Sequence, residues 1–284
     1  MPWLPELFSG PALQQLLDKQ RRDKLAIVPY FDGLLAGEPE ALVGSFAGEP
    51  ELYDPVRGRI KGERAFRAYV ADMRVWFAQR NCAIEDVELV ILPERGFQEV
   101  VLHLDAGNGR VDLPVAVVAD HRAGAGTPID ELRVYHTSWP LTRRHAVRPP
   151  LLQADPELRE RADVAGYQRA LAAGDLDAIV AAFEPDGYAR EPSGGRYVHR
   201  GPYGLRAFYE RLFSNGGGIP LEQCAIMDDG RACALEYNVV RWGATDLPPQ
   251  AGIAVYVRGE SGKLAAARIY DDADPPVGRR RART

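Results

Sequence analysis

The sequence predicts an α+β fold built from two tandem copies of one module. A segment that begins at Tyr30 recurs at Tyr167 and runs without a gap to Pro55 and Pro192, at a constant separation of 137 residues. Each copy starts with apolar residues at helical spacing and ends in β-rich runs, an order typical of α+β domains. Because the period is far longer than that of a solenoid repeat, it indicates whole domains in tandem.

Length and composition agree with two globular domains. The chain has 284 residues, of which 46% are hydrophobic, and its net charge is −5, so each domain can have its own core and nucleic acid is not an expected partner. No apolar run approaches the ~18 residues of a membrane span, and the N-terminus lacks the features of a signal peptide. The three cysteines are widely spaced, without a CxxC motif. We therefore expect a cytoplasmic protein without a metal site or membrane contact.

The first copy is predicted to contain three helices before its strands. The first helix ends near Gly37, where a glycine suits a C-cap, and a short second helix runs up to Phe46. The acid–proline pair Asp54-Pro55 follows in a strand or loop. The third helix is "ERAFRAYVADMRVWF", and the strands lie in "VELVILPERGFQEVVLHLD", "VDLPVAVVADHR" and "ELRVYHT".

The second copy repeats this order. Gly174 takes the place of Gly37, "DAIVAAF" has helical spacing, and Glu191-Pro192 stands where the first copy has its acid–proline pair. The third helix, "YGLRAFYERLF", precedes the strands "ALEYNVVRW", "AGIAVYVRG" and "AAARIYDD". The proline-rich residues 140–155 are predicted as the linker, and we place the domains at residues 1–148 and 149–284.

These motifs resemble the SnoaL-like and ketosteroid isomerase-like branch of the nuclear-transport-factor-2-like (NTF2-like) superfamily. The resemblance covers residues 160–273 closely and residues 25–139 more loosely. It implies, in each copy, a cone of three helices on a curved antiparallel sheet, with an apolar pocket at the open end. We expect the two cones to pack as an intramolecular pseudo-dimer. A higher oligomer is an alternative that the sequence leaves undecided. The fold hosts isomerases, cyclases, epoxide hydrolases and non-enzymes, so the reaction does not follow from it.

The resemblance assigns candidate catalytic residues. Glu191 and Asp54 match the general base of the ketosteroid isomerases, and Tyr167 and Tyr30 match their oxyanion-hole tyrosine. The protonated aspartate of those isomerases falls on Ala254, so steroid isomerisation itself is not expected. The alternatives are structural: acid–proline pairs often begin turns, and a tyrosine can pack with only its hydroxyl at a rim.

A second acid recurs 31 residues after the first, as Glu85 and Glu222, and Asp86 aligns with Glu222 equally well. Epoxide-opening ether cyclases of polyether pathways resemble this arrangement of tandem modules with two acids per pocket. Opening an epoxide with an internal alcohol needs a proton donor and a base, which two carboxyls with different pKa values can supply. The alternative for each acid is a solvent-facing position at the start of a strand.

Four further residues are candidate substrate contacts, namely His103, Glu236, Asp271 and Trp76. His103 could equally be a core histidine, Glu236 could face outward from its strand, and Trp76 could be a core or interface residue. Asp271, which lies opposite His136 in the repeat, ends the closing strand near the expected pocket mouth.

The sequence thus predicts a cofactor-independent isomerase or cyclase that acts by general acid–base catalysis on an apolar natural-product intermediate of polyketide or polyether type. The alternative is a non-catalytic small-molecule-binding or scaffold protein that has kept the cone. Because the second copy keeps the closer family likeness, it is expected to hold the more active pocket. The first copy is expected to be a second site or a structural partner.

Overall fold

The computed structural model describes residues 30–276 except 38, 108, 122–127 and 195–196. The N-terminal residues considered above for a signal peptide lie outside this part. The first half contains α2 (Tyr30–Ala36), α3 (Pro39–Gly44), β1 (Glu51–Asp54), β2 (Gly58–Lys61), α4 (Glu63–Ala78), β3 (Ala83–Ile91), β4 (Arg95–Asp105), β5 (Arg110–His121) and β6 (Ile129–Tyr135). After α5 (Trp139–Thr142), the second half contains α6 (Ala162–Ala173), α7 (Leu176–Ala181), β7 (Phe183–Arg190), β8 (Val198–Arg200), α8 (Gly201–Phe213), β9 (Leu221–Asp228), β10 (Ala232–Trp242), β11 (Thr245–Arg258) and β12 (Leu264–Tyr270).

Each half is built on one six-stranded sheet. The strand orders are β2-β1-β6-β5-β4-β3 and β8-β7-β12-β11-β10-β9, which correspond strand for strand. With three helices before and between the strands of each half, the predicted α+β fold of two tandem domains is confirmed. One detail differs from the antiparallel sheet that was expected, because β1 runs parallel to β6 and β7 runs parallel to β12. These strands are far apart in sequence, so no hairpin forces them to run antiparallel.

Glycines end the first helix of each half, as predicted. Gly37 and Gly174 have φ angles of 66° and 70°, a left-handed conformation that glycine adopts without strain. At Gly174 the chain also passes close to a neighbouring loop, since a Cβ there would lie 2.9 Å from the backbone nitrogen of Gly218. The next residue, Asp175, caps α7 by accepting a hydrogen bond of 3.0 Å from the Ala178 nitrogen.

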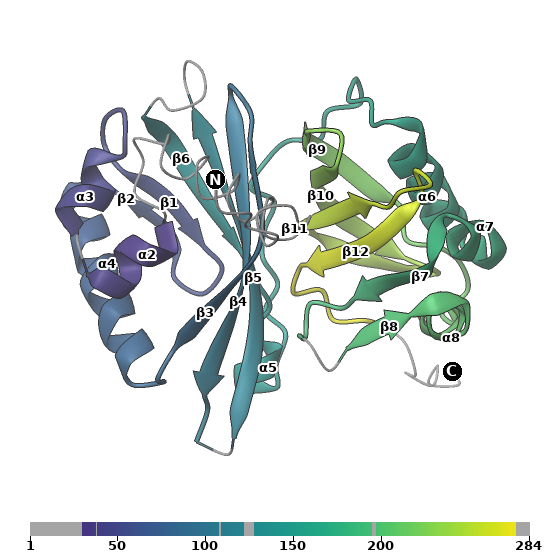
Figure 1. The fold of residues 1–284 in the computed structure, drawn as a ribbon, viewed down its shortest axis with the longest axis horizontal. Helices are drawn as coiled ribbons and strands as arrows, with labels where there is room; N and C mark the ends of the chain where they lie inside the picture. The colour runs from purple at the N-terminus through teal and green to yellow at the C-terminus, as the bar shows by residue number, and fades with distance from the viewer. Residues whose placement is uncertain (1–29, 38, 108, 122–127, 195–196, 277–284) are drawn as a thin grey trace, which may run out of the picture.

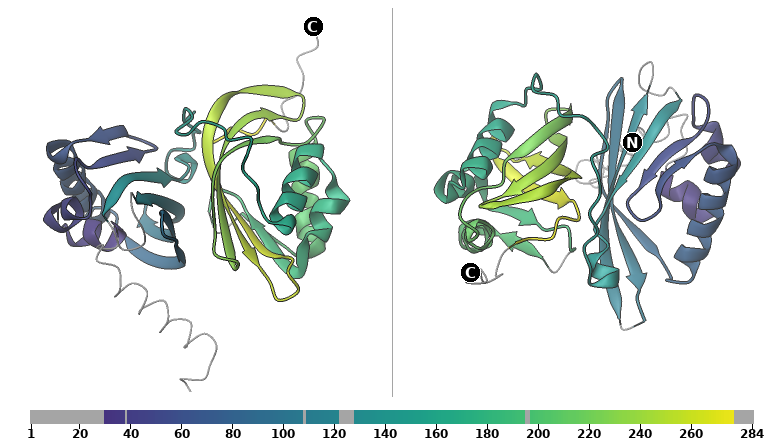
Figure 2. Two further views of the ribbon diagram at one scale, coloured as in Figure 1. Left: turned by 90° about the horizontal axis from the view of Figure 1, so that it is seen from above. Right: turned by 180° about the vertical axis from the view of Figure 1, so that it is seen from behind.

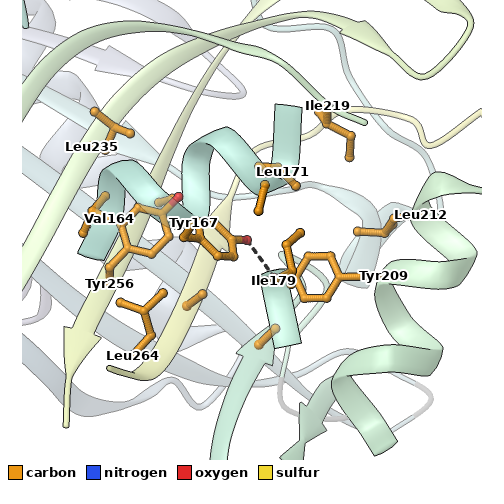
Figure 3. Close-up of a cluster of buried hydrophobic side chains, with 14 of the residues drawn as sticks. Val164, Tyr167, Leu171, Ile179, Tyr209, Leu212, Ile219, Leu235, Tyr256 and Leu264 are labelled. Carbon is orange, nitrogen blue, oxygen red and sulfur yellow. Dashed lines mark hydrogen bonds between the residues drawn. The ribbon is translucent and has the colours of Figure 1, made fainter. Parts of the chain in front are cut away.

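The helices cover the outer face of each sheet, and the two remaining sheet faces pack against each other (Figures 1 and 2). One apolar core therefore lies under the helices of each half; that of the second half includes Tyr167, Tyr209 and Leu235 (Figure 3). A third cluster lies between the sheets and joins residues such as Phe97 with Ile253. Because both faces of the central strands are covered, residues 232–239 of β10 are all buried. No helix in the described part of the chain is long and apolar enough to cross a membrane.

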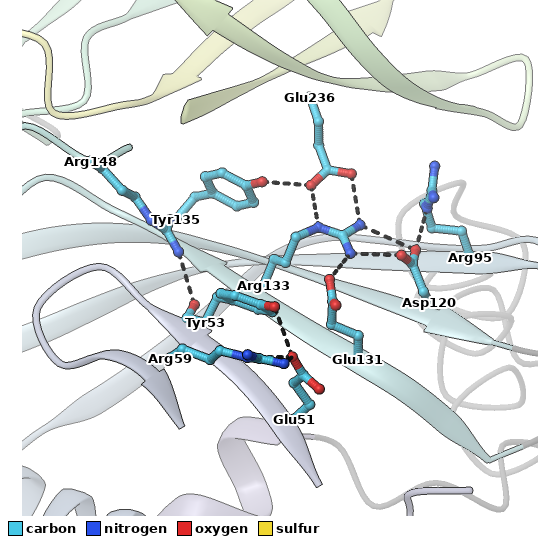
Figure 4. A network of polar contacts seen from close by, with 10 residues as sticks. All are labelled: Glu51, Tyr53, Arg59, Arg95, Asp120, Glu131, Arg133, Tyr135, Arg148 and Glu236. Carbon is cyan, nitrogen blue, oxygen red and sulfur yellow. Dashed lines mark hydrogen bonds and ion pairs between the residues drawn. The ribbon is translucent and has the colours of Figure 1, made fainter. Parts of the chain in front are cut away.

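A buried ionic cluster joins the first sheet to the second (Figure 4). Arg133 of β6 donates to both carboxylate oxygens of Glu236 on β10, at 2.7 and 2.9 Å. The hydroxyl of Tyr135 donates to the same carboxylate at 2.6 Å. Arg133 and Glu236 are 0% and 1% exposed, so both charges are desolvated and depend on each other.

The same cluster occurs a second time with the two halves exchanged. Arg268 of β12 donates to both carboxylate oxygens of Glu99 on β4, and the hydroxyl of Tyr270 donates to that carboxylate as well. Each half therefore supplies an arginine and a tyrosine to a glutamate of the other half. This reciprocity is the arrangement found in two-fold symmetric interfaces between identical subunits.

We expect Arg133→Met to lower the free energy of unfolding by about 3–5 kcal/mol, because Glu236 would remain buried without its counter-charge. The double variant Arg133→Met/Glu236→Gln should recover a large part of this loss. The measurement is urea unfolding of the full chain. Arg206→Met serves as the control, since its ion pair with Asp177 lies on the surface and should contribute less than about 1 kcal/mol. Equal effects of Arg133→Met and Arg206→Met would contradict the role of the cluster.

Candidate functional site

Each half contains a pocket between its helices and the sheet face that they cover. The pocket of the first half, the N-terminal pocket, has a volume of about 410 Å³, and that of the second half, the C-terminal pocket, about 260 Å³. Aromatic and aliphatic side chains form most of both linings, which is typical of sites for small organic molecules. The two pockets also differ in their few polar groups.

A pair of tyrosines lines each pocket. The hydroxyl oxygens of Tyr167 and Tyr209 lie 2.7 Å apart in the C-terminal pocket (Figure 3), and those of Tyr30 and Tyr69 lie 2.7 Å apart in the N-terminal pocket. Burial raises the pKa of Tyr167 to about 12 and raises that of Tyr209 well above its ordinary value, so both hydroxyls stay protonated. One hydrogen of the Tyr167–Tyr209 pair is used within the pair. The other has no acceptor among the residues that the structure describes, which leaves it available to a ligand. Tyr69 instead donates its hydrogen to Asp54 at 3.3 Å.

Asp271 is a half-buried carboxyl of the C-terminal pocket. It directly follows β12, and its Oδ2 accepts a hydrogen bond of 2.8 Å from the hydroxyl of Tyr237 on β10. Its Oδ1 accepts a bond of 3.2 Å from the Ala273 nitrogen. Burial raises the pKa of Asp271 above its ordinary value, and no ion pair within the described residues involves it. Asp271 is therefore a carboxyl of increased basicity in an apolar site.

Glu191 lines the same pocket from the end of β7. Its Oε1 accepts a hydrogen bond of 2.9 Å from Arg211 and lies 2.7 Å from Nε2 of His199. The ring of His199 is held in turn by stacking on Phe208, with ring centroids 4.2 Å apart. The C-terminal pocket thus contains two carboxyls in different surroundings, since Asp271 has a tyrosine partner and Glu191 has two basic partners.

The N-terminal pocket has a different set of polar groups. Asp54 lines it, but Oδ1 of this carboxylate accepts the backbone N–H groups of Val56 and Arg57, at 2.8 and 2.7 Å, and so closes the turn between β1 and β2. His136 follows Tyr135 in this pocket as Asp271 follows Tyr270 in the other. Burial lowers the pKa of His136, which favours the neutral ring. The two pockets therefore differ in acid–base chemistry.

Of the residues that the sequence singled out, six line a pocket: Glu191, Tyr167, Asp271, Asp54, Tyr30 and Trp76. Their functional roles stay predictions. Sequence reasoning missed Tyr209, Tyr69, Tyr237, His199 and Arg211 as polar groups of the sites. The apolar stripe of α8 contains Tyr209, but core and pocket positions share that stripe, so the pattern alone does not separate them.

The other four candidates lie outside both pocket linings. Glu85 and His103 pair with each other at 3.0 Å on the sheet face away from the helices, and Glu85 is exposed. His103 also bonds Asp112 at 2.8 Å. The expected pocket positions fail for these two because their strands alternate, and the inward neighbours Ile84 and Leu102 belong to the core.

Glu222 and Glu236 are displaced for the same reason. Leu221 lines the C-terminal pocket, so the next residue along β9, Glu222, points to the opposite face, where it is exposed. Glu236 also faces away from its own pocket, and it is buried only because the first sheet covers it and supplies Arg133. Neither glutamate is placed to act on a ligand in the pocket.

Comparison with protein families matches residues 164–267 to the SnoaL-like domain. These residues are a SnoaL-like domain. The first half has the same strand order, so the chain consists of two tandem domains of the NTF2-like fold.

Similar solved structures include an NTF2-like protein of unknown function from Burkholderia xenovorans, 22% identical over 40% of this chain and 83% of that one, with a TM-score of 0.33. A protein of ketosteroid isomerase-like fold from Catenulispora acidiphila, in complex with trimethylamine, is 12% identical over 41% and 90%, with a TM-score of 0.34. The epoxide hydrolase/cyclase-like enzyme SalBIII, which has a role in pyran ring formation in the polyether salinomycin, is 22% identical over 38% and 87%, with a TM-score of 0.33. No curated protein matches this chain.

The pocket of the SnoaL-like domain is completed by residues that precede this domain. Trp139 of α5 and His145 line it, whereas Ser138, Leu141 and Thr142 line the N-terminal pocket. Asp272 holds this segment in place, because its carboxylate lies 2.8 Å from Nδ1 of His145 and accepts the backbone nitrogens of Ser138 and Ala146 at 3.0 and 3.1 Å.

Asp272 and His145 favour each other's charged form. Burial alone would raise the pKa of Asp272, but the hydrogen bonds from His145 and its other donors lower it below the ordinary value. The bond to Asp272 raises the pKa of His145, although burial opposes this. Within the described residues, no group of three or more His, Cys, Asp and Glu side chains is arranged to hold a metal ion.

We expect the stability lost in Asp272→Asn to depend on pH. The contribution of Asp272 is present above its unfolded pKa near 3.8 and is lost as the pH falls through its lower folded pKa. That of His145 is present below its unfolded pKa near 6.5 and is lost as the pH rises through its higher folded pKa. The loss in unfolding free energy should therefore be largest between these values, at about 1–3 kcal/mol. Urea unfolding at pH values below, within and above this range tests it. The surface variant Asp177→Asn is the control, and an equally flat pH profile for both variants would contradict the pairing.

Proposed function

We propose that the C-terminal pocket is the active site of a cofactor-independent isomerase or cyclase for an apolar small molecule. The observation that carries this proposal is Asp271, a half-buried carboxyl of raised pKa that has no ion-pair partner in the described structure. It shares an apolar pocket with a tyrosine pair, one hydroxyl hydrogen of which has no acceptor among the described residues. A general base is most effective when its pKa is raised toward the working pH. The hydroxyl pair Tyr167–Tyr209 supplies the hydrogen-bond donor that such a reaction needs for its developing oxyanion.

The proposed reaction begins at an acidic C–H bond next to a carbonyl. The carboxylate of Asp271 takes the proton, and the electron pair of the C–H bond forms an enolate, whose oxygen receives a hydrogen bond from the Tyr167–Tyr209 pair. In an isomerisation, protonated Asp271 returns the proton to another carbon of the enolate system. In a cyclisation, the enolate carbon attacks a second carbonyl, and the oxygen of that carbonyl takes up the proton.

Opening of an epoxide by an internal alcohol would use the same groups. The tyrosine pair would give its free hydroxyl proton to the ring oxygen as the C–O bond breaks, while the alcohol oxygen forms the new C–O bond and Asp271 takes the alcohol proton. Transfer of the proton from Asp271 back to the tyrosine through solvent would restore both groups. Glu191, held by Arg211 and His199, would bind polar groups of the substrate. In this proposal the two halves act as an intramolecular pseudo-dimer in the cytoplasm. The three cysteines, which form no disulfide in the structure, are in keeping with that location.

The proposed base can be tested without knowledge of the natural substrate. β-Tetralone is a compact apolar ketone, and exchange of its α-protons in heavy water can be followed by proton NMR. We expect the protein to accelerate this exchange and Asp271→Asn to lose about 10²–10⁴-fold of the acceleration, with an unchanged thermal melt. Tyr209→Phe should lose less, since Tyr167 remains. Asp54→Asn is the matched control in the other pocket and should keep the rate.

The pH dependence of this exchange shows whether Asp271 acts as a base or as an acid. A base acts in its ionised form, so the rate should rise with pH through a pKa above the ordinary aspartate value of 3.8 and then level off. A rate that falls over this range would assign Asp271 as an acid instead. Binding of β-tetralone without any exchange would favour the non-catalytic ligand-binding alternative.

A further inference from the structure

We propose that His145, a residue of the segment between the two domains (residues 136–161, between β6 and α6), contacts the substrate of the C-terminal pocket and selects molecules with an anionic oxygen at the pocket mouth. This inference deepens the proposed function, because it names a feature of the substrate of the same site. Such a group would be a carboxylate on an otherwise apolar molecule.

The first support is the way in which the ring of His145 is fixed. Its Nδ1 lies 2.8 Å from Oδ1 of Asp272, and the ring stacks on Trp139, with centroids 6.3 Å apart and an angle of 25° between the planes. No hydrogen bond among the described residues occupies Nε2. Because the side chain lines the pocket and is 21% exposed, its second ring nitrogen is available to a ligand.

The second support is the charge of this ring. Asp272 favours the imidazolium form of His145, in which both ring nitrogens carry a hydrogen. Asp271 and Asp274, which follow β12, also raise the pKa of His145. The nearby guanidinium of Arg143 lies over the ring of Trp139, 4.5 Å from its centroid. The His145–Asp272 pair is neutral as a whole. Selection would therefore come from one charge-assisted hydrogen bond and not from a positive field.

The third support is that Arg211, the other basic side chain of the pocket lining, already forms an ion pair with Glu191. The residues that line the C-terminal pocket include two basic side chains, His145 and Arg211. Arg211 donates to Glu191 at 2.9 Å, so its charge is compensated inside the site. The Nε2 hydrogen of His145 is thus the basic donor that remains for an anionic ligand.

This assignment gives the tandem arrangement a specific purpose. Both His145 and Trp139 lie outside residues 164–267, the segment that matches the SnoaL-like domain. A single SnoaL-like domain would therefore lack this wall and its donor. The structure assigns to the segment between the domains a part in substrate recognition, in addition to its part in joining them.

The test compares two probes with the same ring system, β-naphthoate, which carries a carboxylate, and naphthalene, which does not. Affinities for the full chain are measured by fluorescence titration at neutral pH. The wild type should bind β-naphthoate more tightly than naphthalene. His145→Phe, which keeps the ring stacked on Trp139, should bind β-naphthoate about tenfold more weakly and change the affinity for naphthalene less than about twofold. His145→Gln, which keeps a donor without the charge, should be intermediate.

Two controls locate the effect. His103→Phe removes a histidine that also has acidic partners but lies outside both pockets, and it should change neither affinity. Arg80→Met alters the N-terminal pocket and should also change neither. Equal affinities of the wild type for the two probes, equal losses for both in His145→Phe, no loss for β-naphthoate, or a loss in Arg80→Met would each overturn the inference. Since no turnover is measured, these outcomes are separate from the result of the proton-exchange assay.

Discussion

The reciprocal Arg–Glu pairs between the two sheets are the constraint on which the rest of the structure depends. Glu99 and Glu236 are nearly or fully buried, and a buried carboxylate is tolerated only with a full set of partners. Those partners, an arginine and a tyrosine in each case, come from the opposite half. The sheets are therefore fixed face to face, and the central strands are buried on both sides.

This packing decides where ligands can bind. Because one face of each sheet is used for the interface, the helices and the pockets are confined to the other. The same constraint holds for both halves, and the interface positions have stayed equivalent, with Tyr135 matched by Tyr270. The very next residue faces the pocket instead, and there the halves differ, as His136 and Asp271. Interface symmetry and pocket asymmetry can coexist because successive residues at the end of a strand serve different faces.

The sequence alone predicted the repeat, the order of helices and strands and the glycine C-caps, because these depend on local periodicity and backbone conformation. It also identified acids and tyrosines that the structure places in the pockets. It did not predict which strand acids face inward. Glu222 and Glu85 lie in strands whose pairing register shifts at bulges, and one shifted residue reverses the face of every side chain beyond it. Glu236 could not be assigned from its strand pattern, since nothing local shows that a second sheet covers it.

The segment between the domains, predicted only as a proline-rich linker, is fixed to the structure along its length. Arg148 donates to the carbonyl oxygens of Val134 and Tyr53 and lies over the ring of Tyr135. Its own carbonyl accepts a hydrogen bond of 2.9 Å from the nitrogen of Ala251 on β11. Asp272 holds the part before it.

A segment with anchors on both sheets cannot move independently of either, so the position of Trp139 and His145 follows from the packing of the sheets. The ionic clusters at the interface therefore act on the C-terminal pocket as well, because they set the distance between its own sheet and the wall that the first half supplies. In a pair of separate subunits this wall would be lost whenever the subunits dissociate. Covalent connection keeps this wall at a high effective concentration, which is a physical advantage of the tandem chain over two separate subunits.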